Sequence, residues 1–391
     1  MTIRSIVRLK PGRENSILRF HPWVFSGGIQ SIDNEPVDGD WVEVQNHQKR
    51  TLGFGHYQKG TITVRMIVFG EEIPTDTIWA AKITKAYLQR RATNVVSAFT
   101  NGFRLVHGEG DGLPGLIIDV YNKVAVVQAH SAGMHNDRHK ISDAIREVLG
   151  DDVTAVYYKS PSVGKIQTEN EYLFGMAAVP HIMVEHGNQF FVDWEEGQKT
   201  GFFLDQRENR KLLGEFCDGK KVLNTFCYTG GFSVYALQNK AKVVHSVDAS
   251  EKAIELTRKN LELNGFSADD NGCFAEDTFD FIRDKQGEYD VIVLDPPAFA
   301  KHKEAKHQAM KGYQRLNAEA MRIIKPGGVI FTFSCSQVVD RQLFYDTIVS
   351  SAIQAKRSIK VLHHLSQPAD HPVSILHPEG EYLKGLVLWV E

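Results

Sequence analysis

The C-terminal half of the chain contains a series of short apolar runs, each of which stops at a residue that can take part in binding or catalysis. The runs cover 221–226, 243–248, 290–294 and 329–334, and they lead to Gly230, Asp248, Asp295 and Cys335. Helical patterns of about ten residues alternate with the early runs, which predicts βαβ units and a parallel sheet. Side chains at the carboxyl ends of such strands line the ligand crevice. The ends of the runs therefore indicate the candidate site.

Composition excludes several classes of protein. The chain has 391 residues, 42% of them hydrophobic and 24% charged, which is typical of a globular protein of two or three domains. No apolar run approaches the roughly 20 residues that span a bilayer, and the N-terminus lacks the apolar region of a signal peptide. The four cysteines form no Cys-x-x-Cys pair, so neither zinc nor a disulfide framework is expected. We expect a cytoplasmic protein without a metal.

Three domains are expected. Residues 1–70 contain short apolar segments separated by glycines, which predicts a small β-barrel or sandwich. Residues 71–188 contain two helical patterns, at 75–98 and 138–149, among strand patterns, and so indicate a central α+β domain. Residues 189–391 then form the α/β domain, following a hairpin centred on 186–188. A homodimer is one assembly open to this chain.

Basic residues are concentrated at the N-terminus. The first 20 residues carry 5 Lys or Arg against 1 Glu, although the net charge of the whole chain is −3. Such local excess favours a polyanionic partner. Arg8, Lys10 and Arg13 are the expected contacts to RNA phosphates.

The first two runs predict a cofactor site. Gly230 and Gly231 stand between a strand and a helix, where a ligand can approach the backbone and helix N–H groups. Asp248 ends the next strand, at the distance where an acidic residue binds a ribose hydroxyl pair. The turn starts with Tyr228-Thr229 and is not Gly-x-Gly-x-x-Gly, which favours S-adenosylmethionine over a dinucleotide. Asp277 follows a third short strand, where it could meet an adenine amino group or could equally be a surface aspartate.

The last two runs predict a catalytic site. Asp295 is followed by two prolines, which would hold its carboxylate rigidly beside a planar base. Cys335, between two serines, is expected just before a helix that begins near Gln337, where the helix N-terminus would lower the pKa of the thiol. A thiolate that adds to C6 of a pyrimidine makes C5 nucleophilic toward a methyl group, which is covalent catalysis. Cys227 is expected to be a packing residue instead, and a packing role is also the plain alternative for Cys335.

At these motifs the chain resembles the RlmI-like family of 23S ribosomal RNA 5-methylcytosine methyltransferases. The similarity covers nearly the whole sequence. The matching motifs are His21-Pro-Trp-Val-Phe25, Gly108-Glu-Gly-Asp-Gly-Leu-Pro-Gly115, Gln198 to Arg207, Asn224 to Ser233, Asp295 to Phe299, Phe333 to Ser336, Ala369 to Pro372, and Pro378 to Gly385.

The resemblance implies an N-terminal PUA-like domain, a central domain and a class I (Rossmann-like) S-adenosylmethionine-dependent methyltransferase domain. It implies ribosomal RNA as the partner, Cys335 as the nucleophile and Asp295 as the group that holds the cytosine edge. Many RNA 5-methylcytosine enzymes carry a second cysteine after the motif aspartate, but this chain has Asp-Pro-Pro-Ala there, so another group must remove the C5 proton. The resemblance also places Phe203, Asp205 and Gln206 where the family's segment before the first strand borders the cofactor. All the expected cofactor contacts together are Phe203, Asp205, Gln206, Phe226, Tyr228, Thr229, Gly230, Gly231, Asp248, Asp277 and Asp295.

Three other functions stay open at this point. A related RNA guanine methyltransferase would share the Asp-Pro-Pro turn but would not need Cys335. An RNA-binding module for ribosome assembly would bind the cofactor without chemistry. A small-molecule methyltransferase is disfavoured by the additional N-terminal β domain.

Overall fold

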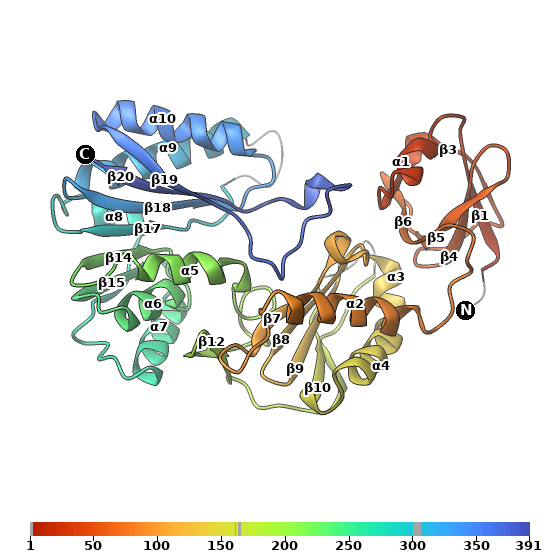
Figure 1. Ribbon diagram of the computed structural model, residues 1–391, viewed down its shortest axis with the longest axis horizontal. Helices are drawn as coiled ribbons and strands as arrows, with labels where there is room; N and C mark the ends of the chain where they lie inside the picture. Colours follow the sequence, from red (N-terminus) through yellow and green to blue (C-terminus); the bar gives the residue numbers. More distant parts are fainter. Residues whose placement is uncertain (1–2, 161, 163–165, 300–305) are drawn as a thin grey trace. The chain divides into compact units, whose positions relative to one another are not determined.

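The computed structural model describes residues 3–160, 162, 166–299 and 306–391 and divides into two compact units (Figure 1). Unit 1 comprises Met1–Met183, Val192–Phe202 and Ala369–Gly380, and unit 2 comprises Val184–Phe191, Phe203–Pro368 and Glu381–Glu391. The two boundaries of the three expected domains, at 70 and 188, stay a prediction. No helix of the described residues is long and apolar enough to cross a membrane.

The N-terminal part of unit 1 is a six-stranded sheet with the order β2-β6-β5-β4-β1-β3. Its strands are β1 (Ser5–Leu9), β2 (Trp23–Phe25), β3 (Ile29–Asp33), β4 (Trp41–Gln45), β5 (Thr51–Tyr57) and β6 (Ile62–Phe69), with the short helix α1 (Glu14–Leu18) after β1. Alternate residues Val7, Val42, Val44 and Val64 are buried together, as period-two patterning requires. The expected small β domain is therefore confirmed.

The rest of unit 1 is a five-stranded sheet with the order β11-β10-β9-β8-β7. Its elements are β7 (Gly102–His107), β8 (Leu116–Tyr121), β9 (Val124–Ala129), β10 (Ala155–Tyr158) and β11 (Glu171–Phe174), with helices α2 (Ile78–Ala92), α3 (Ala132–Asn136) and α4 (Arg138–Leu149). Helix α4 has the predicted bounds. Helix α2 ends earlier than expected, because Asn94 adopts a left-handed φ of 56° that a helix cannot continue through.

The two sheets of unit 1 share a buried polar contact. Trp41 Nε1 donates to Asp137 Oδ2 at 3.0 Å, and His56 Nε2 lies 3.1 Å from the same oxygen. Burial lowers the pKa of His56 although Asp137 opposes that shift. Asp137 therefore links strands β4 and β5 to the start of α4.

Unit 2 contains a seven-stranded sheet with the order β16-β15-β14-β17-β18-β20-β19. The strands are β14 (Lys221–Thr225), β15 (Val243–Asp248), β16 (Cys273–Ala275), β17 (Val291–Leu294), β18 (Gly328–Ser334), β19 (Ile359–Leu365) and β20 (Lys384–Val390). Strands β14 to β18 are parallel, and β20 runs antiparallel between β18 and β19. The predicted parallel Rossmann-like sheet is confirmed, and β14, at the point where the strand order reverses, carries the glycine turn.

Helices cover both faces of this sheet (Figure 1). Helices α8 (Thr278–Ile282), α9 (Lys306–Ile323) and α10 (Arg341–Ala355) share one buried core with the strands. Helices α5 (Arg207–Gly214), α6 (Gly231–Gln238) and α7 (Glu251–Leu263) lie together on the other face. The hairpin β12 (His181–Glu185) and β13 (Asn188–Val192) has the predicted turn.

Candidate active site

Asp248 lies at the carboxyl end of β15, next to the end of β14. Its Oδ2 accepts the backbone N–H of Tyr228 at 3.0 Å, and its Oδ1 accepts that of Ser250 at 3.0 Å. Each oxygen keeps a second lone pair for another donor. A carboxylate held in this way beside the glycine turn fits the binding of two ribose hydroxyls.

The glycine turn has a strained backbone. Phe226 and Tyr228 are not glycines, yet they adopt φ angles of 54° and 48°. Such residues are uncommon and cost about 1–3 kcal/mol each, and they concentrate at binding sites. Gly230 also has a positive φ, of 74°, and an added Cβ would lie 2.7 Å from Thr257 Cγ2. Its backbone angle and the packing on α7 therefore each favour glycine at 230, and its role toward a cofactor stays a prediction.

Asp277 has a structural role that the sequence did not predict. Its Oδ1 accepts the N–H groups of Phe279 at 2.8 Å and Asp280 at 3.3 Å, which makes it the N-cap of α8. The residue is exposed at the carboxyl edge of the sheet. Its role toward an adenine stays a prediction.

The segment 203–206 is held by contacts to three separate parts of unit 2. Arg210 Nη1 donates to the Phe203 carbonyl at 2.9 Å, and the Phe203 ring lies 5.1 Å from that of Tyr228. Tyr382 donates its hydroxyl to Asp205 Oδ2 at 2.7 Å. Gln206 Nε2 donates to Asp295 Oδ1 at 3.0 Å. The structure thus places Phe203 beside the glycine turn and Gln206 beside Asp295.

A buried ion cluster orients this segment. The Glu185 carboxylate is fully buried and accepts Nε and Nη2 of Arg210, both at 2.8 Å. Arg207 Nε lies 3.4 Å from the same carboxylate, and the Tyr235 hydroxyl donates to it at 3.0 Å. Sequence analysis missed Glu185 because it is far from its partners in the chain.

Cys335, Asp295 and Tyr313 come together at the carboxyl ends of β17 and β18. Burial raises the pKa of the Tyr313 phenol to about 12, and electrostatic interactions with Cys335 and Asp295 add to this effect. Cys335 is the one partly exposed cysteine among the four. This arrangement puts a thiol and a carboxylate within electrostatic reach of the same hydroxyl.

The prediction that a helix begins next to Cys335 is wrong. Residues 337–339 form a turn, and α10 begins at Arg341, where the Asp340 side chain accepts the Leu343 N–H at 2.8 Å. Aspartate is a strong N-cap, so Asp340 was the signal that located the helix start. The helix N-terminus is therefore not next to the thiol. The cation that lies there is Lys384, whose Nζ donates to the Ser336 carbonyl at 2.7 Å.

The other cysteines are packing residues in this structure. Cys227 is buried with its Sγ 3.6 Å from Thr257 Oγ1, and burial raises the pKa of its thiol strongly. Burial also raises the pKa of the Cys217 thiol to about 12 and raises that of Cys273. These environments favour the unreactive thiol form.

The three predicted RNA contacts belong to unit 1, whereas the other predicted site residues belong to unit 2. Arg8 Nη2 is 3.4 Å from Asp33 Oδ2, and Lys10 Nζ donates to the Gly27 carbonyl at 3.0 Å. Arg13 lines a hollow of about 330 Å³ together with Phe25. Asp33 therefore already neutralises part of the charge on Arg8.

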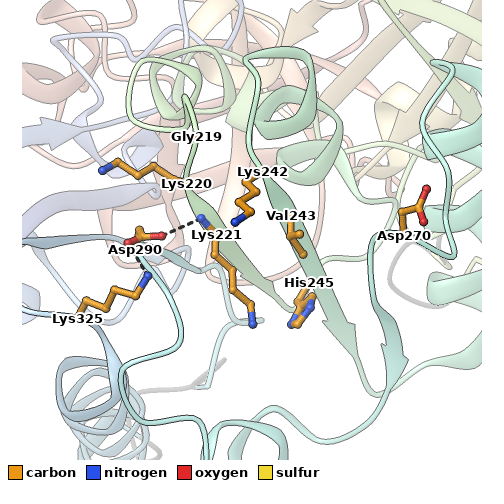
Figure 2. A pocket seen from close by; sticks show the side chains of 9 residues that line it. All are labelled: Gly219, Lys220, Lys221, Lys242, Val243, His245, Asp270, Asp290 and Lys325. Atoms are coloured by element: carbon orange, nitrogen blue, oxygen red, sulfur yellow. Dashed lines mark hydrogen bonds and ion pairs between the residues drawn. The ribbon is translucent and has the colours of Figure 1, made fainter.

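A separate cavity of about 620 Å³ lies at the opposite edge of the sheet of unit 2, at the amino ends of β14 and β15 (Figure 2). Its lysines include Lys221 and Lys325, and Asp290 accepts both the Lys221 N–H and Lys325 Nζ at 2.8 Å. None of the predicted site residues lines it. It is therefore not the cofactor crevice.

The sheet order, the glycine turn and Asp248 define a class I methyltransferase. Residues 163–385 match the family described as S-adenosylmethionine-dependent methyltransferase, and residues 7–69 match the PUA-like domain family. A relative from Shewanella amazonensis, "Ribosomal RNA large subunit methyltransferase I", is 40% identical over 99% of both chains. A protein of the same name from Aeromonas hydrophila is 38% identical over 98% of both. The chain belongs to this family of S-adenosylmethionine-dependent methyltransferases.

Solved structures support the fold. A protein from Streptococcus mutans, described as a candidate S-adenosylmethionine-dependent methyltransferase, has a TM-score of 0.83 at 24% identity and covers 98% of this chain and 100% of its own. Trm5b from Pyrococcus abyssi has a TM-score of 0.54 at 18% identity and covers 98% and 99%. At these identities the similarity concerns the fold alone.

Proposed function

We propose that this protein transfers a methyl group to C5 of a cytosine in large-subunit ribosomal RNA through a covalent adduct with Cys335. The observation that carries the proposal is that Asp295 and Cys335 directly follow the neighbouring parallel strands β17 and β18, at the carboxyl edge of a methyltransferase sheet. The full-length similarity to ribosomal RNA large subunit methyltransferase I proteins supports the substrate class.

The residues divide the reaction into two easier parts. The Cys335 thiolate adds to C6 of the cytosine, and Asp295 holds the N3 and N4 edge so that the base accepts the electron pair. When bound, S-adenosylmethionine supplies an electrophilic methyl group. Removal of the C5 proton restores the C5–C6 double bond and expels the sulfur as a thiolate. Gln206 positions Asp295 by donating to its Oδ1.

Deletion of the gene tests this function. Large-subunit ribosomal RNA from the deletion strain should lose one 5-methylcytosine, which bisulfite sequencing and nucleoside mass spectrometry would detect. The wild-type gene should restore it. Loss of a methylated guanine instead would support the non-covalent alternative, and an unchanged RNA would support the assembly module.

Replacing Asp248 by Ala should weaken S-adenosylhomocysteine binding by roughly 1–3 kcal/mol, because an acceptor for the ribose hydroxyls is lost. The same change removes the acceptor that holds the Tyr228 N–H. Isothermal calorimetry measures the effect, with Glu255→Ala on the exposed side of α7 as the control. Equal affinities of the two variants, or tight binding of NAD in place of S-adenosylhomocysteine, would contradict the assignment.

Replacing Arg8, Lys10 and Arg13 together by Ala should weaken RNA binding and flatten its salt dependence. Each lost phosphate contact reduces the slope of log K against log salt by about 0.7–0.9. The matched control replaces Lys49, Arg50 and Lys59, three exposed cations of the same β domain. If both triple variants bind equally well, the N-terminal basic residues are not the RNA contact.

A further inference from the structure

Lys384 is a buried lysine beside the proposed nucleophile. It is the first residue of β20 and pairs directly with Ser334, the last residue of β18. Lys384 is 4% exposed. Its Nζ donates to the Ser336 carbonyl at 2.7 Å and to the Tyr382 carbonyl at 2.6 Å. Cys335 stands between Ser334 and Ser336, so Lys384 is held against both chain neighbours of the thiol.

A buried ammonium is costly unless an opposite charge lies near it. Four ionisable groups act electrostatically on Lys384, namely Cys335, Arg341, Glu381 and Asp340, and the largest of these effects comes from Cys335. The Glu381 carboxylate pairs with the Arg341 guanidinium, and Asp340 caps α10. Cys335 is therefore the strongest electrostatic partner that Lys384 has among these groups.

We propose that the Lys384 ammonium is the counter-ion that holds the Cys335 sulfur as a thiolate. The inference rests on the proposed function for its purpose, but the ion pair itself is measurable without RNA. It assigns to a lysine of β20 the electrostatic role that a helix N-terminus beside the thiol would otherwise have.

The proton balance is simple. The proton leaves Sγ and is taken by the Nζ amine, which forms a thiolate and an ammonium. Two N–H groups of the ammonium are bonded to the carbonyls of Ser336 and Tyr382, which leaves the third for the sulfur among the contacts of the described residues. The ammonium keeps its proton while the sulfur is bonded to C6, and the ion pair re-forms when the sulfur is expelled.

The surrounding groups make such a cation necessary. Cys335 and Asp295 both act on the Tyr313 hydroxyl, and a carboxylate disfavours a second negative charge close to it. Burial lowers the pKa of Lys384 to about 8, while the Cys335 thiolate opposes that shift. The amine is thus able to accept a proton near neutral pH.

Alkylation of the full-length protein by iodoacetamide, followed by mass spectrometry of the Cys335 peptide at a series of pH values, tests the pair. In the wild type the alkylation rate should reach half its maximum at a midpoint pH below about 8.5, the pKa of a free thiol. Lys384→Met should slow alkylation at pH 7 by roughly tenfold or more, because one pKa unit changes the thiolate fraction tenfold. Lys360→Met, an exposed lysine of neighbouring β19, is the matched control and should react like the wild type.

Lys384→Gln separates charge from structure. Glutamine retains an amide that can donate to the two carbonyls, so a purely structural role predicts wild-type reactivity, whereas the ion pair predicts the slow rate of Lys384→Met. A wild-type midpoint above 8.5 would overturn the proposal even if neither variant folded. An RNA that is not methylated at cytosine, together with a Lys384-dependent midpoint, would reject the proposed function and keep the ion pair.

Discussion

Replacement of Cys335 by Ala is expected to abolish methyl transfer to RNA, by about 10³-fold or more, while the fold and cofactor binding remain intact. The loss is large because C5 has no nucleophilic character until sulfur adds to C6. Removing one member of a catalytic unit costs about as much as removing all of them. The thiol is partly exposed and ends a strand, so the substitution removes little buried surface. Transfer of labelled methyl groups to ribosomal RNA measures the rate.

RNA that contains 5-fluorocytosine distinguishes the covalent mechanism from its alternatives. Wild-type protein should become trapped as an adduct because fluorine cannot leave as a proton, and Cys335→Ala should not. Asp295→Asn should form the adduct more slowly, since it changes the charge that faces the base and leaves the thiol in place. Cys217→Ala, which alters a buried thiol with a raised pKa, should retain activity. Methylation of RNA by Cys335→Ala at nearly the wild-type rate would instead support the guanine methyltransferase.

The parallel sheet was predictable because its signal is local. The run 243–248 became β15 with unchanged bounds, since its β-branched residues Val243, Val244 and Val247 favour a strand and Asp248 ends it. Helix α4 was equally clear from its amphipathic pattern. The helix expected near Gln337 begins four residues later, at Arg341, where the Asp340 side chain caps it.

The site was predictable where it depends on strand ends, and unpredictable where it depends on pairing across the chain. Asp248, Asp295 and Cys335 lie at the carboxyl edge as expected, because every parallel strand brings its end there. Lys384 gave no such signal. It lies beside Cys335 because β20 runs antiparallel to β18, and this reversal brings the start of β20 against the end of β18. Neither composition nor periodicity predicts which strand will pair antiparallel with β18.

Glu185 is the other important residue that only the structure reveals. Its carboxylate lies between two buried guanidinium groups, those of Arg207 and Arg210, and accepts both bonds of the Arg210 fork. Paired charges are tolerated in the interior because each removes the desolvation cost of the other. Removing one partner leaves the others buried without their common counter-charge.

Glu185→Ala should therefore lower the free energy of unfolding by about 3–5 kcal/mol, the cost typical of breaking a buried ion pair. Chemical denaturation followed by circular dichroism measures it. The matched control is Glu208→Ala, which removes an exposed carboxylate of α5 that lies 3.8 Å from His186 Nε2. An exposed pair contributes about 0–1 kcal/mol, so this variant should unfold almost like the wild type.

The same substitution should also weaken S-adenosylhomocysteine binding at temperatures where the variant is still folded. Arg210 holds the Phe203 carbonyl with the guanidinium that Glu185 orients, so its release loosens the segment that places Phe203 against Tyr228. Glu185→Gln should keep more of the stability than Glu185→Ala, because its amide oxygen still accepts a bond from Arg210, but it lacks the charge. If the three proteins unfold at the same denaturant concentration, the cluster is not a determinant of stability, and Phe203 must be positioned by other contacts.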